Sequence, residues 1–261
     1  MIIDAHAHIY PKKIAQKATQ AIGDFYDINM GHTGTAEDLL AEGKRAGIKK
    51  FIVHSCATKA HQVRSINEFI KEEIDSHKEF IGFMTLHQDL TYDEIEKEVD
   101  WCIGNGFKGI KLHPDFQRFN IDCEEAERFY RIVGNRLPFL FHIGDDRYDF
   151  SAPNRLVKMA KKYSNVNFIA AHFGGYRCWE QVEIYRGLDN IYFDTCSSLA
   201  FIGPEKAREI IDILGVEKFF FATDFPMWDA REELERFNRI KLNEEEREKI
   251  LCKNIEKLLK I

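Results

Sequence analysis

The sequence predicts an α/β protein in which a single domain, residues 1–261, folds as a (β/α)8 TIM barrel. Short apolar runs alternate with longer amphipathic segments, and this alternation favours a parallel sheet with helical crossovers. Eight such runs in 261 residues match the strand count and length typical of this barrel. No G-x-G-x-x-G motif follows the first run, so a doubly wound nucleotide-binding sheet is less favoured.

The expected strands are short runs rich in apolar, β-branched and aromatic residues. After the first step, they begin roughly 25 to 32 residues apart, which is the length of one strand-plus-helix unit. We expect strands at Ile2–His6, Lys50–His54, Phe80–Leu86, Phe107–Leu112, Pro138–His142, Val166–His172, Ile191–Asp194 and Lys218–Thr223.

Segments with helical periodicity lie between and after these runs. The segment Ile9–Ala36 is long and contains three glycines, so we expect an irregular loop or lid over the first strand. Glu246 stands three residues after Asn243, a pattern typical of a capped helix start. The expected helices are Glu37–Ala46, His61–Ser76, Tyr92–Ile103, Cys123–Asn135, Pro153–Tyr163, Pro204–Leu214, Asp229–Arg239 and Asn243–Leu259.

Composition and charge exclude several classes of protein. Hydrophobic residues make up 44% and charged residues 31% of the chain, which suits a globular core rather than a disordered segment. The net charge is −6 with both signs interspersed, so we expect no nucleic-acid partner. We expect no membrane span and no signal peptide, because the required apolar stretches are missing. Six cysteines without a CxxC pair are typical of reduced thiols in the cytoplasm.

Histidines gather where the expected strands end. Seven of the ten histidines stand at these positions, together with Lys111, Asp194 and Asp224. Because a barrel builds its active site at the C-terminal ends of its strands, we expect most of these side chains to meet in one site. His54, His87 and Asp194 are either supporting or substrate contacts of that site or plain barrel packing. The seven are His6, His8, His54, His87, His113, His142 and His172.

His6 and His8 are separated by one small residue, Ala7. Residues two apart on a strand point to the same face, so both imidazoles are expected inside the barrel. Two imidazoles on one face form half of a site for zinc or a similar metal. A surface or capping pair is the alternative for this short motif taken alone.

His142, His172 and Asp224 each end a strongly apolar run. Burying the carboxylate of Asp224 without a partner would cost several kcal/mol, so we expect a metal, a cation or a hydrogen-bonded proton beside it. The two histidines are either part of the same site or core residues that hydrogen-bond a carbonyl group. Two glycines follow His172 closely, and glycine allows the backbone to approach a ligand.

These motifs, in this order, resemble the amidohydrolase superfamily over the whole chain. More narrowly, they resemble its amidohydrolase-related branch of metal-dependent hydrolases, lactonases and non-oxidative decarboxylases. The resemblance implies an enzyme with a divalent metal, most simply zinc, with manganese as the alternative. It implies that His6, His8, His142 and Asp224 bind the metal and that His172 lies near the metal-bound water or the substrate. The motifs are Asp4-Ala-His-Ala-His8, Gly109-Ile-Lys-Leu-His-Pro114, His142, Ala171-His-Phe-Gly-Gly175, Thr223-Asp-Phe-Pro226 and a C-terminal helix with Asn254.

Lys111 leaves the number of metals open. Some superfamily members carry a carboxylated lysine here that bridges two metals, and Lys111 shares a strand face with His113. The sequence Lys-Leu-His-Pro is also common in the branch that binds one metal, so we expect one metal per chain rather than two. Some lactonases of the branch work without metal. Arg147 and Trp228 follow strand-end motifs and are either contacts for an anionic or planar substrate or surface residues.

The expected function is hydrolysis of a small-molecule lactone, ester or amide by a metal-activated water. A metal lowers the pKa of bound water towards about 7. Asp224 is the expected base, and His172 is the expected second acid or base. The alternative is a lyase that decarboxylates an aromatic or unsaturated acid, and a third reading is a metal-binding barrel without catalysis. The expected partner is a small-molecule substrate, and the sequence is compatible with a homodimer.

Overall fold

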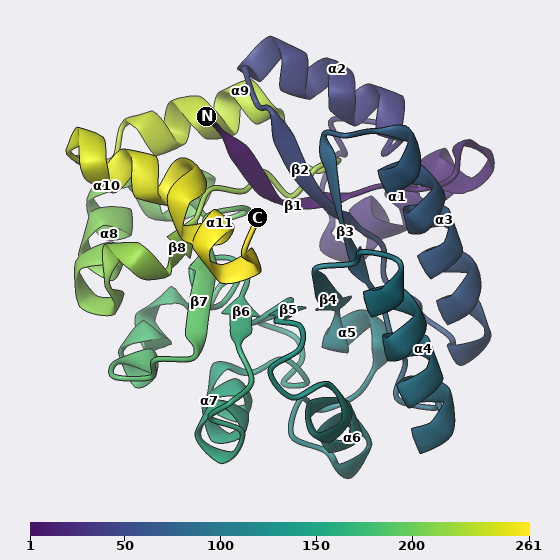
Figure 1. The fold of residues 1–261 in the computed structure, drawn as a ribbon. Helices are drawn as coiled ribbons and strands as arrows, with labels where there is room; N and C mark the ends of the chain where they lie inside the picture. The colour runs from purple at the N-terminus through teal and green to yellow at the C-terminus, as the bar shows by residue number, and fades with distance from the viewer.

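The computed structural model describes residues 1–261 and shows eight parallel strands in a barrel (Figure 1). The strands are β1 (Ile3–His8), β2 (Lys50–His54), β3 (Phe80–Met84), β4 (Gly109–Leu112), β5 (Phe139–Phe141), β6 (Phe168–Ala170), β7 (Ile191–Asp194) and β8 (Phe219–Phe220). Each strand pairs with the next one along the chain. A parallel bridge between Ala7 and Phe225 brings the segment after β8 back to β1. The predicted single-domain (β/α)8 barrel is confirmed.

Helices surround this barrel (Figure 1). Side-chain caps fix several of their starts; for example, Asn243 and Glu246 form the expected reciprocal cap. The α-helices are α1 (Lys12–Tyr26), α2 (Ala36–Ala46), α3 (Val63–Ser76), α4 (Tyr92–Gly104), α5 (Pro114–Gln117), α6 (Glu124–Val133), α7 (Pro153–Lys162), α8 (Leu199–Leu214), α9 (Ala230–Asn238), α10 (Glu244–Glu248) and α11 (Asn254–Leu259). Short 3-10 helices are η1 (Ala60–Gln62), η2 (Trp179–Tyr185) and η3 (Val216–Lys218), and the π-helical turn η4 (Lys249–Lys253) joins α10 to α11.

The helix α1 corrects the prediction that Ile9–Ala36 is an irregular loop. The buried face of α1 consists of Ala15, Thr19 and Gly23, one residue in every four. These side chains are small, so the helix lacks the strong apolar periodicity that sequence analysis depends on. A Cβ atom on Gly23 would lie 2.7 Å from the carbonyl oxygen of Ile28, which explains a glycine inside a helix.

Other boundaries differ in smaller ways. β5, β6 and β8 are shorter than predicted, and the residues that follow them carry the site in loops. The helix α8 consists of two helical segments with the non-helical Gly203 between them, so the second segment begins at Pro204, as expected. The helix expected over 243–259 is divided by the π-helical turn.

The interior of the barrel is closed at one end by the C-terminus. Side chains such as Phe83, Leu140 and Phe220 fill the interior, and Ile255 and Leu259 of α11 pack against the same cluster. In Figure 1, α11 lies across the barrel near the N-terminus. Since this end is filled, a site can open only at the C-terminal ends of the strands.

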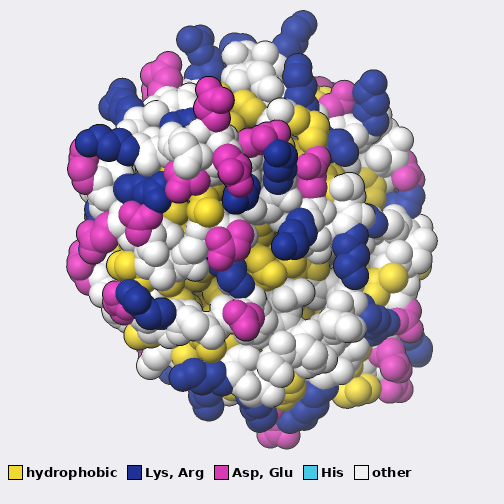
Figure 2. Space-filling model, turned by 60° about the vertical axis from the view of Figure 1, so that its left-hand side comes forward, with side chains coloured by type: hydrophobic (Ala, Val, Ile, Leu, Met, Phe, Trp, Pro, Cys, Tyr) yellow, Lys and Arg dark blue, Asp and Glu magenta, His cyan; other side chains and the backbone are white.

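The surface agrees with the charge pattern of the sequence. On the face shown in Figure 2, acidic and basic side chains alternate without a large patch of one sign. None of the helices combines the length and the apolar character that a membrane crossing requires.

Asn254 offers a test of the closure by α11. Its amide donates to the carbonyl oxygens of Val216 and Phe219 at 2.8 and 2.9 Å. Asn254→Ala removes the donor from both carbonyls, and we expect the free energy of unfolding to fall by about 2 kcal/mol. Urea denaturation measures this change. Lys257→Ala, at an exposed position of the same helix, is the control, and an equal loss in both variants would contradict the assigned role.

Candidate active site

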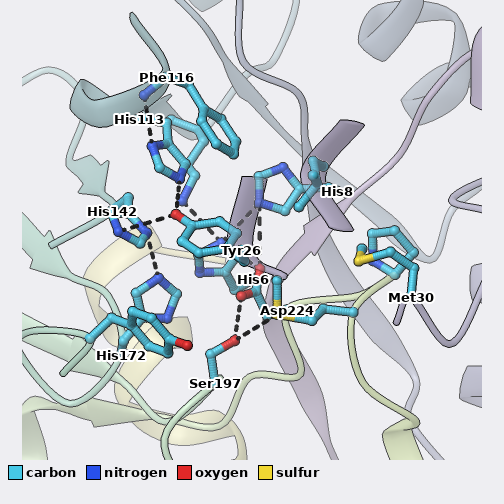
Figure 3. A pocket seen from close by; sticks show the side chains of 15 residues that line it. His6, His8, Tyr26, Met30, His113, Phe116, His142, His172, Ser197 and Asp224 are labelled. Carbon is cyan, nitrogen blue, oxygen red and sulfur yellow. Dashed lines mark hydrogen bonds and ion pairs between the residues drawn. The ribbon is translucent and has the colours of Figure 1, made fainter. Parts of the chain in front are cut away.

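A buried pocket at the C-terminal ends of the strands collects most of the predicted site residues (Figure 3). Five of the seven strand-end histidines line it, and the other two, His54 and His87, do not. Apolar and aromatic side chains, among them Ile22, Met30 and Tyr176, form the remaining wall. The predicted residues that line the pocket are His6, His8, Lys111, His113, His142, His172 and Asp224.

Three of the four predicted metal ligands converge. The Nε2 atom of His6 lies 3.2 Å from Nε2 of His8 and 3.3 Å from Oδ1 of Asp224. Nε2 of His8 lies 3.5 Å from the same oxygen. Ligand atoms on a tetrahedral ion with bonds of about 2.1 Å are about 3.4 Å apart. The donor set and its spacing therefore fit a divalent metal.

Asp194 orients His6. One oxygen of the buried Asp194 carboxylate lies 2.8 Å from Nδ1 of His6, and the other accepts the backbone N–H of His172 at 2.8 Å. Because a carboxylate only accepts, Nδ1 of His6 carries the proton and Nε2 presents a lone pair to His8 and Asp224. Sequence analysis did not decide between a site role and barrel packing for Asp194. The structure places it directly behind His6.

Lys111 supplies the only cationic side chain on the pocket wall. It is fully buried, and its Nζ atom lies 3.0 Å from Nε2 of His6. Burial lowers the pKa of His6 and of His8 well below the ordinary value, with the charge of Lys111 as the next cause. Burial raises the pKa of Asp224 to about 6, although Lys111 opposes this change. Both imidazoles are thus neutral and keep the lone pairs that a metal needs.

His142 does not join the other three predicted ligands. Its Nε2 atom donates to the carbonyl oxygen of Gly144 at 2.8 Å, and its Nδ1 atom lies 2.9 Å from Nε2 of His172. The potential ligand atoms of His142 group with those of His113 and Asp115. To act as the predicted ligand, His142 would have to exchange its contact with His172 for the metal.

His113 presents a proton rather than a lone pair to the pocket. Its Nδ1 atom accepts the backbone N–H of Phe116 at 3.4 Å, so its Nε2 atom is the protonated one. That atom lies 2.9 Å from the hydroxyl oxygen of Tyr26. The ring of His113 is stacked between Phe116 and His142, with ring centroids at 3.7 and 4.0 Å.

Sequence analysis missed Tyr26 and Ser197. The Tyr26 hydroxyl enters the centre of the pocket from the end of α1 (Figure 3) and lies 3.4 Å from Nε2 of His142. The Ser197 hydroxyl donates to Oδ2 of Asp224 at 2.5 Å and accepts the indole N–H of Trp228 at 2.9 Å. Trp228 therefore reaches the site through Ser197. Only the position of Ser197, shortly after a strand-end aspartate, could have indicated it.

Backbone conformation also marks the site. His172, Ser197 and Asp224 have φ values of 64°, 50° and 59°. Left-handed residues other than glycine cost roughly 1–3 kcal/mol each and persist where surrounding structure holds them, often at functional sites. The barrel thus holds three site residues in an unfavourable conformation.

Arg147, a predicted substrate contact, lies outside the pocket wall. Its guanidinium group donates twice to Asp145, at 2.8 and 2.9 Å, and once to the carbonyl oxygen of Phe25. It also lies 4.4 Å from the centroid of the Phe25 ring. The structure therefore places Arg147 where it holds the end of α1 over the site.

Solved structures with the same fold include two decarboxylases. A 2,6-dihydroxybenzoate decarboxylase from Rhizobium is 18% identical, with a TM-score of 0.75 and coverage of 99% of this chain and 98% of that one. A 5-carboxyvanillate decarboxylase from Novosphingobium aromaticivorans, complexed with manganese and 4-hydroxy-3-methoxy-5-nitrobenzoic acid, is 14% identical, with a TM-score of 0.78 and coverage of 100% and 96%. An uncharacterised TIM-barrel protein from Bordetella bronchiseptica is 15% identical, with a TM-score of 0.79 and coverage of 99% and 98%.

Sequence comparison identifies the family. No curated protein matches the chain, and the solved structures are too distant in sequence to show more than the fold. The amidohydrolase family model, however, matches residues 3–261. This match runs through every strand and every motif that lines the pocket, so the chain belongs to the amidohydrolase family and is an enzyme of that family.

Proposed function

We propose that the enzyme is a metal-dependent, non-oxidative decarboxylase of an aromatic acid. The observation that carries this proposal is the narrow space at the converging histidines and Asp224, where Ile22, Met30 and Tyr176 form the apolar part of the wall. The pocket leaves about 30 Å³ of free space, which is room for about one water molecule. Decarboxylation needs room there only for the substrate carboxylate, whereas the hydrolysis expected from the sequence needs room for a water molecule beside the substrate. Decarboxylases with the same fold support the same choice.

A larger cavity beside the pocket suits the ring of such a substrate. It measures about 670 Å³ and shares His8, Ile22 and Phe116 with the pocket. Apolar side chains of α1 and α3, including Ala18 and Phe69, form its walls. Cavities of about 300–1,000 Å³ are typical of small-molecule sites. We place the ring of the acid in this cavity and its carboxylate towards His6 and His8.

One divalent metal is proposed, held by His6, His8 and Asp224, with His142 kept as the predicted further ligand. Zinc is the expected ion, and manganese suits the same nitrogen and oxygen donors. When bound, the metal supplies positive charge that holds the substrate carboxylate and offsets negative charge that develops during the reaction.

The residues of the chain supply the proton. Asp224, which shares a hydrogen bond with Ser197, is the proposed acid. It gives a proton to the ring carbon that bears the carboxylate. The bond from that carbon to the carboxylate then breaks, its electron pair returns to the ring, and CO2 leaves. One proton from solvent restores Asp224, so each turnover consumes one proton and releases one CO2. His172, bonded to His142, remains the predicted second acid or base.

The reaction class is tested by product analysis. We expect the metal-loaded protein to release CO2 from at least one hydroxylated aromatic acid in a panel that includes 2,6-dihydroxybenzoate and 5-carboxyvanillate. Asp224→Asn should lower turnover by about 100- to 10,000-fold, because the variant cannot donate the proton. Hydrolysis of a lactone, ester or amide in a parallel panel, without CO2 from any acid, would contradict this proposal and support the hydrolase function expected from the sequence. Metal binding without turnover in either panel would support the non-catalytic reading.

Metal stoichiometry tests the ligands and the number of ions. His8→Gln should retain less than about a tenth of the metal of the parent protein, because it removes an imidazole from the converging set. Lys111→Ala should keep a ratio near one metal per chain. Elemental analysis measures both, with His61→Gln, at an exposed histidine, as the matched control. A parent ratio near two that falls to one in Lys111→Ala would instead indicate a bridging carboxylated lysine.

The substrate cavity is tested by filling it. Ala18→Phe places a ring in the cavity without touching the histidine pocket. We expect KM to rise about tenfold or more while metal content stays unchanged, because substrate binding is lost and the metal ligands are not affected. Gln16→Phe adds the same ring to the same helix at an exposed position and should leave KM unchanged. Equal effects of the two variants would place the substrate elsewhere.

A further inference from the structure

The hydroxyl group of Tyr26 carries a proton that no neighbouring side chain accepts. Two ring nitrogens lie near its oxygen, Nε2 of His113 at 2.9 Å and Nε2 of His142 at 3.4 Å. Nε2 of His113 is protonated, because Nδ1 of that ring accepts the N–H of Phe116. Nε2 of His142 is protonated, because it donates to the carbonyl oxygen of Gly144. The Tyr26 oxygen can therefore accept from these rings, but neither ring can accept its proton.

This free donor lies inside the pocket. Figure 3 shows the Tyr26 ring across the pocket, with its hydroxyl group towards His113 and His142. The ordinary pKa of tyrosine is about 10, so the hydroxyl group keeps its proton at neutral pH. Most polar groups in protein interiors are paired, because an unpaired donor is unfavourable. A ligand that fills the pocket with an acceptor atom would therefore supply the partner that Tyr26 lacks.

The end of α1 holds the Tyr26 side chain in place. Tyr26 is the last residue of this helix. The centroid of its ring lies 5.9 Å from that of Phe116 and 5.8 Å from that of Tyr176. The guanidinium group of Arg147 lies 5.4 Å from the same centroid. A donor that is already held in position loses less conformational freedom when a ligand binds, so Tyr26 is suited to binding.

We propose that the Tyr26 hydroxyl donates a hydrogen bond to the carboxylate of the bound acid, an inference that rests on the proposed decarboxylase function. A carboxylate only accepts hydrogen bonds, and bonds to an ionised acceptor are the strong ones. The pocket has room only for a small group, and the ring of the acid is placed in the larger cavity. The decarboxylated product has no carboxylate for this bond. Tyr26 thus makes the enzyme bind the acid in preference to its product.

Steady-state kinetics with an acid that the parent protein decarboxylates test this inference. We expect Tyr26→Phe to raise KM at least about tenfold, because a hydrogen bond to a charged group is lost. The inhibition constant of the decarboxylated product and kcat should both stay within about threefold of the parent values. Tyr148→Phe is the matched control and should leave KM unchanged. Tyr148 is an exposed tyrosine near the same end of α1 and lines neither cavity.

A crystal of the unmodified, metal-loaded protein with benzoate supplies a readout that needs no variant. We expect a carboxylate oxygen within about 3.0 Å of the Tyr26 hydroxyl oxygen. Benzoate held without this contact overturns the inference while the decarboxylase function stands. An unchanged KM in Tyr26→Phe, or a KM that rises together with the inhibition constant of the product, does the same. A parent protein that releases no CO2 from any acid overturns the decarboxylase function itself, which is a different result.

Discussion

The hydrogen bond between His6 and Asp194 is the interaction on which the rest of the site depends. It places the proton of His6 on Nδ1, so the other ring nitrogen presents a lone pair to Nε2 of His8 and to Asp224. The lone pair of His6 Nε2 and the Oδ1 atom of Asp224, 3.3 Å apart, repel one another unless a cation or a proton lies between them. Lys111, buried at 3.0 Å from Nε2 of His6, meets part of this need in the structure. These side chains are thus arranged around a site that favours positive charge.

The helix α1 borders both this place and the larger cavity beside it. Ile22 of α1 borders both spaces, Tyr26 enters the pocket, and Ala18 faces the cavity. Arg147 holds the end of α1 through the carbonyl oxygen and the ring of Phe25. Since the pocket has free space of only about 30 Å³, the side chains of α1 limit the room beside the converging residues. The segment expected as a loop or lid is therefore a helix that contributes to the wall of the pocket.

The fold could be predicted from the sequence more completely than the site, for physical reasons. Alternating apolar runs and amphipathic segments specify the barrel, because burial on a sheet or on a helix face imposes those periods. Strand-end positions likewise predict which histidines meet, since parallel strands carry their C-terminal residues to one end. The direction in which each side chain points could not be predicted in this way. Whether His142 turns to His172 or to His6 depends on tautomers and neighbours that no spacing encodes. Tyr26 was missed because the small residues on the buried face of α1 hide its helical period.

The same hydrogen bonds bear on the number of metals. A second ion would have to use the group formed by His113, Asp115 and His142. The Nδ1 atom of His113 accepts a hydrogen bond from the N–H of Phe116, and its Nε2–H donates a hydrogen bond to the hydroxyl oxygen of Tyr26. The Nε2–H of His142 donates a hydrogen bond to the carbonyl oxygen of Gly144. Only the lone pair of Nδ1 could then bind a metal, and that atom faces His172. Two imidazole lone pairs therefore do not converge there, whereas the lone pair of His6 Nε2 faces both His8 and Asp224. The arrangement of protons, more than the list of ligand residues, favours one metal over two.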